Sequence, residues 1–219
     1  SALWAAAEPL PTREQLDAAL RGRIGPALWQ RFQGAKVAVC GLGGLGSHIA
    51  VALARAGVGA LSLIDFDKVD LSNLNRQQYK ASQIGGEKPL ALAENLKEIN
   101  PYLGLECHTL RLTPENIPAV LQGADVICEA FDKAEEKAML VNTVLERLPQ
   151  ATVVAASGMA GLGPGNAIRT EKVGKRLYLC GDGQSDVEEA GSLFAPRVML
   201  CAGHQALAVL RVLAGELDV

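Results

Sequence analysis

A glycine-rich loop is the first feature of this sequence that could do chemistry. Residues 36–40 form a short apolar run, and a loop of four glycines follows it and leads into an alanine-rich helical stretch. Glycines let the backbone turn tightly and let a phosphate approach closely, while a helix N-terminus adds unpaired N–H groups and a partial positive charge. A phosphate-binding loop is therefore predicted at Gly41, Gly43, Gly44 and Gly46.

An acidic residue ends the next apolar run. Asp65 follows residues 61–64 and lies 19 residues after Gly46. A carboxylate in this position can accept hydrogen bonds from the hydroxyl groups of a ribose. NAD, FAD and ATP all carry phosphate and ribose, so the glycine loop and Asp65 predict a nucleotide without specifying which one.

Polar side chains further along the chain distinguish between these nucleotides. Asn73, Arg76 and Gln77 lie within a few residues of one another. Lys88 follows at the start of a predicted helix, and Asp132 comes after the fourth apolar run. Ligands of open α/β sheets bind at the carboxyl ends of the strands. We therefore expect a guanidinium, an ammonium and a carboxylate at the edge that carries the glycine loop.

These residue types suit adenylation, the transfer of AMP from ATP to a carboxylate. The carboxylate attacks the α-phosphorus, and negative charge builds on the phosphate oxygens and on the departing pyrophosphate. Arg76 and Lys88 would stabilise this charge, and Asp132 would hold Mg²⁺ against the triphosphate. No general base is required, because a carboxylate is already ionised at neutral pH. A hydride-transfer site does not need this set of residues.

The elements that must position these residues alternate between strands and helices. Strands are expected at 36–40, 61–64, 103–110, 125–128 and 151–156, and helices follow the glycine loop and occupy 87–99, a short stretch after 114, and 133–148. This alternation predicts an α/β fold with a Rossmann-like, mainly parallel sheet flanked by helices. Residues 166–170 and 176–179 predict antiparallel strands toward the C-terminal end, before an apolar helix at 197–214. An N-terminal helical segment at 12–33 completes what we interpret as one domain over residues 1–219.

Several motifs together resemble the ThiF/MoeB/HesA family of ubiquitin-activating-type enzymes. They are Gly-x-Gly-Gly-x-Gly-Ser at 41–47, Ile-Asp-Phe-Asp at 64–67, Ser-Asn-Leu-Asn-Arg-Gln at 72–77, Lys88 and Asp132. Segments 154–161, 177–183 and 195–206 are similar to the short ThiF branch, which is linked to thiamine biosynthesis. The resemblance spans about residues 20–215 and implies MgATP-dependent adenylation of the C-terminal Gly-Gly carboxylate of a ubiquitin-like sulfur carrier such as ThiS.

The resemblance also implies roles for single residues. ATP would be bound by side chains from two neighbouring segments, namely Asn73, Arg76, Gln77 and Lys88. Asp65 would bind the ribose and Asp132 the catalytic Mg²⁺. Family members are similar in forming homodimers, in which an N-terminal arginine reaches the ATP of the partner. Arg23 is the best match for that arginine and Arg21 the next.

The five cysteines form no C-x-x-C pair, so neither a disulfide framework nor a structural zinc site of four thiolates is expected. Some relatives pass the activated carrier to a cysteine. Cys180 is the candidate for this acceptor, and a core thiol is the other interpretation of it. Cys201 and His204 share a helix face, which favours packing against the sheet.

A polar segment follows Cys180. Residues 181–191 contain several acidic side chains, namely Asp182, Asp186, Glu188 and Glu189. Two interpretations are open for this segment, a flexible cover over the tail of the carrier and a surface loop.

The overall charge and hydropathy argue against some classes of partner. A net charge of −3 does not provide the broad cationic surface that nucleic acid or an anionic membrane requires. The chain lacks an apolar run of about 18 residues, and no leader sequence is expected. The odd number of cysteines without a C-x-x-C pair fits reduced thiols, so we predict a cytoplasmic protein. Three alternatives stay open: an NAD- or FAD-dependent oxidoreductase, an enzyme that activates another carboxylate (on a molybdopterin carrier, a tRNA or a small molecule), and a non-catalytic scaffold that retains nucleotide.

Overall fold

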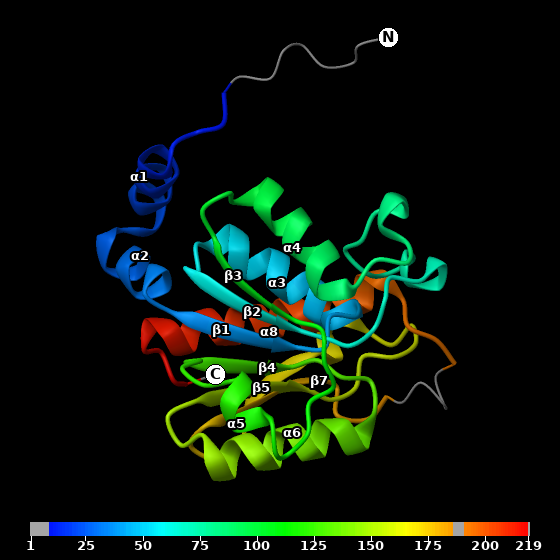
Figure 1. Cartoon of the computed structure of the whole chain (residues 1–219). Helices are drawn as coiled ribbons and strands as arrows, with labels where there is room; N and C mark the ends of the chain where they lie inside the picture. Colours follow the sequence, from blue (N-terminus) through cyan, green and yellow to red (C-terminus); the bar gives the residue numbers. More distant parts are fainter. Residues whose placement is uncertain (1–8, 186–190, 219) are drawn as a thin grey trace.

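A seven-stranded sheet forms the centre of the protein (Figure 1). In this computed structural model, which describes residues 9–185 and 191–218, the strands are β1 (Lys36–Cys40), β2 (Ala60–Ile64), β3 (Gly104–His108), β4 (Val126–Glu129), β5 (Thr152–Ala156), β6 (Arg169–Lys172) and β7 (Leu177–Gly181). Their order across the sheet is β3-β2-β1-β4-β5-β7-β6. All neighbouring strands are parallel except β6 and β7, which are antiparallel. The predicted α/β fold, with antiparallel strands toward the C-terminal end, is confirmed.

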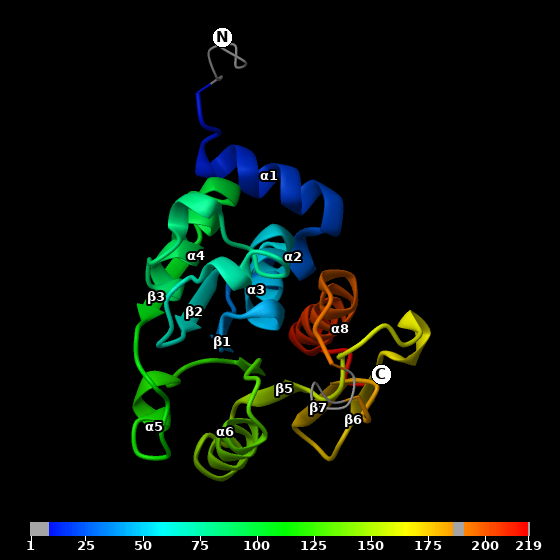
Figure 2. The same ribbon diagram turned by 90° about the vertical axis from the view of Figure 1, so that its right-hand side faces the viewer.

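Helices cover both faces of this sheet (Figure 2). On one face lie α3 (Gly44–Ala56), α4 (Lys88–Ile99) and α8 (Ala195–Ala214), and on the other lie α5 (Ile117–Val120) and α6 (Ala134–Arg147). Strands covered on both faces are expected to be apolar throughout. Residues 37–40 and 126–129 are accordingly fully buried. All of them are apolar except Glu129, which is charged and equally buried.

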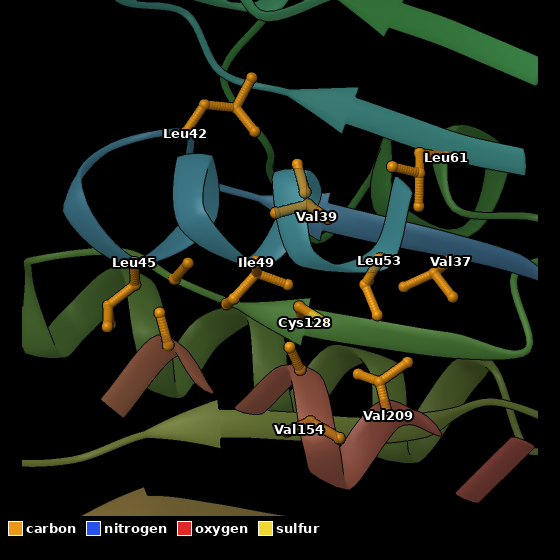
Figure 3. Close-up of a cluster of buried hydrophobic side chains, with 14 of the residues drawn as sticks. Val37, Val39, Leu42, Leu45, Ile49, Leu53, Leu61, Cys128, Val154 and Val209 are labelled. Carbon is orange, nitrogen blue, oxygen red and sulfur yellow. The ribbon is translucent and has the colours of Figure 1, made fainter. Parts of the chain in front are cut away.

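A hydrophobic cluster lies between the sheet, α3 and α8 (Figure 3). Ile49 and Leu53 of α3 are fully buried and pack in this cluster with Cys128 of β4 and Val209 of α8. Of the helices that the structure describes, α8 alone is long and apolar enough to cross a membrane by length and composition. Its apolar side packs into this cluster, as core helices of globular domains do, and its first turn brings Val198 against Gly44.

The N-terminal helical segment forms two helices, α1 (Arg13–Ile24) and α2 (Pro26–Gln33). Gly25 separates them with a φ of 84°, a conformation that glycine adopts without steric cost. Because α2 leads into β1, both helices lie at the end of the sheet where the strands begin (Figure 1). Leu20 of α1 packs against Gly57, directly after the last residue of α3.

The antiparallel pair begins later than its sequence indicates. The sequence predicts a strand at 166–170, but the 3₁₀-helix η3 (Gly165–Ala167) occupies the start of that stretch, and β6 starts only at Arg169. The N–H of Ala167 donates to the C=O of Pro164 over 3.1 Å. Proline has no N–H for a strand ladder and favours a turn at this position. The other predicted strands and helices are present with slightly shifted ends.

Candidate nucleotide-binding site

Three strand ends bring the predicted site residues to one edge of the sheet. In the strand pairing, Cys40 of β1 lies opposite both Ile64 of β2 and Glu129 of β4. Backbone hydrogen bonds continue the alignment, because the N–H of Gly41 donates to Ile64 C=O and the N–H of Ala130 to Cys40 C=O, each over 2.9 Å. The strand order reverses here, where open α/β sheets bind ligands. The glycine loop and the acidic segments after β2 and β4 therefore start side by side.

Close backbone contacts explain the glycines of the loop. Gly41 has a φ of 89°, and a Cβ atom there would lie 2.7 Å from the carbonyl oxygen of Ala130. A Cβ on Gly46 would come within 1.8 Å of the carbonyl oxygen of Gly41. Helix α3 begins at Gly44, so its unpaired N–H groups and the positive end of its dipole lie at the loop. The loop therefore has the shape and the donors that a phosphate requires.

Asp65 fixes this loop through hydrogen bonds. It is buried, and its Oδ2 accepts from the N–H of Leu42 over 2.7 Å while its Oδ1 accepts from the N–H of Asp67 over 2.8 Å. The hydroxyl of Tyr79 donates to Leu42 C=O over 2.6 Å. Burial raises the pKa of Tyr79, and the nearby Asp65 and Asp67 carboxylates act in the same direction. A contact between Asp65 and a ribose stays a prediction. The ribose hydroxyls would donate to the lone pairs of the Asp65 carboxylate that the bonds to Leu42 and Asp67 leave free.

Arg76 and Gln77 lie directly against the glycine loop. The Cγ and Cδ atoms of Arg76 come within 3.7 and 3.8 Å of the position that a Cβ on Gly44 would take. The side-chain nitrogen of Gln77 lies 3.5 Å from the corresponding position on Gly43. The structure thus brings the aliphatic part of the Arg76 side chain and the amide of Gln77 to the start of α3.

The polar atoms of these two side chains are incompletely satisfied. Nη1 of Arg76 donates to neutral oxygens only, Ser72 C=O and Asn75 Oδ1, over 3.3 and 2.8 Å. Within the described ranges, Nε of Arg76 and Oε1 of Gln77 are buried without a hydrogen-bond partner. Buried polar groups are normally paired, so a bound ligand or water is expected to complete this site. Asn73 instead uses its side-chain oxygen to accept from the N–H of Asp70 over 3.0 Å.

Lys88 is buried at the first position of α4, and its ammonium lies near Asp67. Its Nζ is 3.5 Å from Oδ2 of Asp67, and the side chains of Lys88 and Asp67 are 7% and 54% exposed. A nearly buried ammonium beside a half-exposed carboxylate can also attract an anion at this edge. Asp67 was not among the predicted site residues, although the motif Ile-Asp-Phe-Asp contains it.

Asp132 is exposed and lies two residues beyond Ala130, the residue whose backbone touches Gly41. Among the residues that the structure describes, no group of three or more His, Cys, Asp or Glu side chains could hold a metal ion by itself. Mg²⁺ in nucleotide sites is usually bound by one or two carboxylates, and phosphate and water complete its coordination. A single carboxylate beside a phosphate-binding loop fits that mode.

Arg21 and Arg23 lie far from this edge in their own chain. Helix α1 contacts the C-terminal end of α3, and the 13 residues of α3 separate that end from the glycine loop by about 20 Å. The guanidinium of Arg21 lies 5.4 Å from the centre of the Trp29 ring, whereas Arg23 is exposed. Neither arginine can contact a nucleotide in its own chain, so the predicted role is open to them only in a partner.

Cys180 lies in the core and not at the site. It is on β7 and 1% exposed. Burial raises the pKa of its thiol to about 11, although a hydrogen bond with Thr170 acts in the opposite direction. A buried, protonated thiol is a poor nucleophile. The prediction that Cys180 accepts the activated carrier is therefore corrected, and Cys180 is a core thiol. Cys201 is also buried, and His204 hydrogen-bonds to Thr170 over 2.9 Å, so both have packing roles.

The predicted cover at 181–191 is described only in part, because Asp186, Glu188 and Glu189 lie outside the described residues. Asp182 forms a 2.7 Å ion pair with the buried Arg197 of α8. Burial acts to raise the pKa of Asp182, but hydrogen bonds from the N–H groups of Ser185 and Gln184 and from Arg197 lower it overall. Asp182 is therefore a structural link to α8.

A buried ion pair that the sequence analysis missed supports the segment with Asp132. Glu129 ends β4, and its carboxylate accepts from Lys137 Nζ over 3.0 and 3.1 Å and from the N–H of Phe131 over 2.7 Å. Nζ of Lys137 also donates to Ala156 C=O over 3.2 Å. Burial raises the pKa of Glu129, although Lys137 acts to lower it. Glu129 and Lys137 lie eight residues apart in the sequence, and nothing in that spacing indicates that both side chains point inward.

Replacing Lys137 by methionine is expected to destabilise the fold by about 2–3 kcal/mol, because it leaves the carboxylate of Glu129 buried without a cation. Fully buried pairs cost more, but the side chain of Lys137 is 23% exposed. A raised pKa means that the folded state binds the proton of Glu129 more tightly than the unfolded state does, so the deficit should shrink as the pH falls from about 7 to about 5. Urea unfolding measures both effects.

The neighbouring variant Lys133→Met is the matched control, because Lys133 is exposed. It should unfold like the wild type at both pH values. A Lys137→Met variant as stable as this control, or one whose deficit is the same at both pH values, would contradict the role of the pair.

An apolar pocket opens next to Asp65 on the side of the sheet that α6 covers. It is lined by residues at the ends of β2 and β4, after β3 and on α6, including Ile64, Phe66, Leu110, Leu112, Phe131 and Met139. Such a surface suits the flat ring of a nucleobase. These residues give no signal in the sequence, because apolar side chains after strands are indistinguishable there from core residues.

The fold and this edge define a Rossmann-type domain, in which Arg76 packs against the glycine loop and Lys88 and Asp132 lie on segments at the same edge of the sheet. The chain belongs to the ThiF family, whose sequence model matches residues 16–219. This match confirms the family that the motifs indicated.

Curated relatives and solved structures agree with this assignment. The chain is 34% identical over 150 residues to the sulfur carrier protein adenylyltransferase of Thermus thermophilus, covering 66% of this chain and 55% of that protein. It is 35% identical over 132 residues to the tRNA threonylcarbamoyladenosine dehydratase of Escherichia coli, covering 59% and 49%. The chain thus spans about half the length of these relatives. The E. coli dehydratase TcdA in complex with ATP has the same fold, with a TM-score of 0.82 and 23% identity over 95% of this chain and 98% of that one.

Proposed function

We propose that this chain uses MgATP to adenylate the C-terminal Gly-Gly carboxylate of a ubiquitin-like, ThiS-like sulfur carrier in thiamine biosynthesis, releasing pyrophosphate. The observation that carries the proposal is the contact of Arg76 with Gly44, with Lys88 and Asp132 on segments at the same edge of the sheet. The relative from T. thermophilus, a sulfur carrier protein adenylyltransferase, supports both the reaction and the partner.

Each group then has a task in the reaction. The N–H groups at the start of α3 and the guanidinium of Arg76 bind phosphate oxygens, and Asp65 binds the ribose. The ionised carboxylate of the carrier attacks the α-phosphorus, and the bond to pyrophosphate breaks. Arg76 and Lys88 stabilise the charge that builds on the oxygens, which they do better in a partly dry site than in water. Mg²⁺, held by Asp132, would neutralise part of the triphosphate charge.

The alternatives differ in how well they account for these residues and for the charge of the chain. An oxidoreductase would use the glycine loop and Asp65 but would leave Arg76, Lys88 and Asp132 without a task. A carboxylate on tRNA is favoured by the similarity to the E. coli tRNA threonylcarbamoyladenosine dehydratase. Binding of tRNA requires many cationic contacts with its phosphates, and a chain with a net charge of −3 does not offer a broad cationic surface. The charge therefore favours a protein carrier over tRNA.

Exchange between ATP and labelled pyrophosphate tests the proposal. With Mg²⁺ and a carrier ending in Gly-Gly, label is expected to enter ATP, and a carrier truncated before the two glycines is the matched control. Label incorporation that requires a carboxylate-bearing tRNA would assign the second function. Tight binding of NAD without ATP would assign an oxidoreductase, and ATP binding without any exchange would assign a scaffold.

We further propose a homodimer in which Arg23 contacts the nucleotide of the other chain, with Arg21 as the alternative. Arg23 is exposed, and helix α1 contacts the end of α3 that lies about 20 Å from the glycine loop of its own chain, which supports a role in trans. Arg23→Ala and Arg76→Ala variants should each be inactive alone. Mixed and reassociated, they should recover about a quarter of the wild-type exchange, because half of the dimers are mixed and each holds one complete site. A monomer in light scattering, or no recovery, would contradict this arrangement.

We place the protein in the cytoplasm. All five cysteines are free thiols, and four of them are buried. Reduced cysteines are typical of cytosolic proteins, which supports this placement.

A further inference from the structure

A histidine on α3 holds the backbone of Arg76. His48 lies at the start of the second turn of α3, and its Nε2 atom is 3.0 Å from Arg76 C=O. A carbonyl oxygen only accepts, so this ring nitrogen carries the proton and donates. The bond therefore ties the segment that carries Arg76 to the helix that begins at the glycine loop.

The other ring nitrogen of His48 is also paired. The side-chain nitrogen of Gln78 lies 2.9 Å from Nδ1 of His48, and an amide nitrogen only donates. Nδ1 is therefore the unprotonated nitrogen, as expected when the proton is on Nε2. Burial lowers the pKa of His48, although the hydrogen bond with Arg76 acts in the opposite direction. The two bonds hold a neutral imidazole in one tautomer and one orientation.

The neighbouring backbone bonds do not replace the one from His48. The N–H of Gln78 donates to Oγ of Ser47 on α3 over 3.1 Å, two residues beyond Arg76. The N–H of Arg76 itself donates to Asn73 C=O over 3.2 Å, within the same irregular segment. Among the hydrogen bonds of the described residues, the one from His48 alone joins the backbone of Arg76 to an α-helix or a strand.

We propose that His48 is a positioning residue that sets where the guanidinium of Arg76 lies, an inference that rests on the proposed adenylation. A cation stabilises a transition state well only when it is held in place relative to the charge that builds. The side chain of Arg76 follows its backbone, and its Cγ and Cδ atoms pack against Gly44. Without the bond from His48, the backbone can move away from α3 and carry the guanidinium with it. His48 thus acts through Arg76 and not on the substrate.

Two variants of His48 test the donor that it supplies. His48→Leu removes the donor and should lower the single-turnover rate of adenylation by about tenfold, because a small misplacement of a reacting or stabilising group costs rate. In His48→Gln the side-chain nitrogen can take the place of Nε2 and donate to the same carbonyl group. This variant should keep the rate within a factor of about three of the wild type. Equal losses in the two variants would overturn the proposal.

A double-mutant cycle separates positioning from a general structural role. In the Arg76→Ala background, His48→Leu should cause no further loss of rate, because the guanidinium that it positions is absent. A defect in the packing of α3 would lower the rate by the same factor in both backgrounds, and that result would overturn the proposal. The control His204→Leu removes a histidine that hydrogen-bonds to Thr170 of β6, and it should leave the rate unchanged. Thermal unfolding shows whether each variant is folded.

Nitrogen NMR of the wild-type protein tests the geometry without any measurement of activity. The sequence has three histidines, and the imidazole signals that disappear in His48→Gln belong to His48. At about pH 7.5 this ring should be neutral with its proton on Nε2, and a proton on Nδ1 would overturn the proposal. A wild-type chain without carrier-dependent exchange would refute the proposed function and this inference together. An active wild type with the other tautomer, or with a loss that does not depend on Arg76, would refute only the role of His48.

Discussion

Asp132→Ala is expected to abolish carrier-dependent exchange between ATP and pyrophosphate and to leave the protein folded. Asp132 is exposed, so its loss removes no buried contact. It lies two residues beyond Ala130, whose carbonyl group meets Gly41 of the phosphate-binding loop. The variant would lack the carboxylate that we assign to Mg²⁺, and the charge of the triphosphate would then be left to the cations of the protein alone.

Glu135→Ala provides a matched control for this prediction. Glu135 is an exposed acid on the first turn of α6, three residues after Asp132, and its removal changes the net charge equally. The control should exchange pyrophosphate at the wild-type rate, and both variants should unfold at the wild-type temperature. Near-normal exchange in Asp132→Ala at saturating Mg²⁺ would refute the magnesium assignment.

Arg76→Ala is expected to lower the single-turnover rate of adenylation by roughly two orders of magnitude or more, the effect of losing one preorganised donor to the transition state. The side chain packs against Gly44, and its Nε is buried without a partner within the described ranges. The guanidinium is therefore held in place before the nucleotide binds. Because it acts on charge that builds during the reaction, the rate should fall more than the affinity for the carrier.

Two further variants separate charge from geometry at this position. Arg76→Lys keeps the positive charge but not the planar donors, and we expect it to recover only part of the rate. Lys80→Ala removes a nearby cation that pairs with Glu98 at the surface, and it should leave the rate unchanged. If Arg76→Ala adenylated the carrier within a factor of about three of the wild type, transition-state stabilisation by Arg76 would be ruled out.

The sequence by itself determined the type of fold and the residues to examine. Apolar runs with helical stretches between them predicted a parallel sheet, because only strands covered on both faces are apolar throughout. The glycines at 41, 43 and 46 predicted the phosphate-binding loop. The structure explains part of their spacing, because Gly46 approaches Gly41 too closely for a side chain. Asp65, Arg76 and Lys88 were found because they lie in short local motifs.

Only the tertiary structure decided which of these side chains face one another. The pairing of β1 with both β2 and β4 places residues far apart in the sequence at one edge, and no local pattern encodes that contact. The inward turn of Glu129 and Lys137, the burial of Cys180 and the stacking of Arg111 on Phe66 likewise depend on neighbours from other elements. Burial and ion pairing are properties of the packed chain, and a sequence pattern reports them only when the partners are close in sequence.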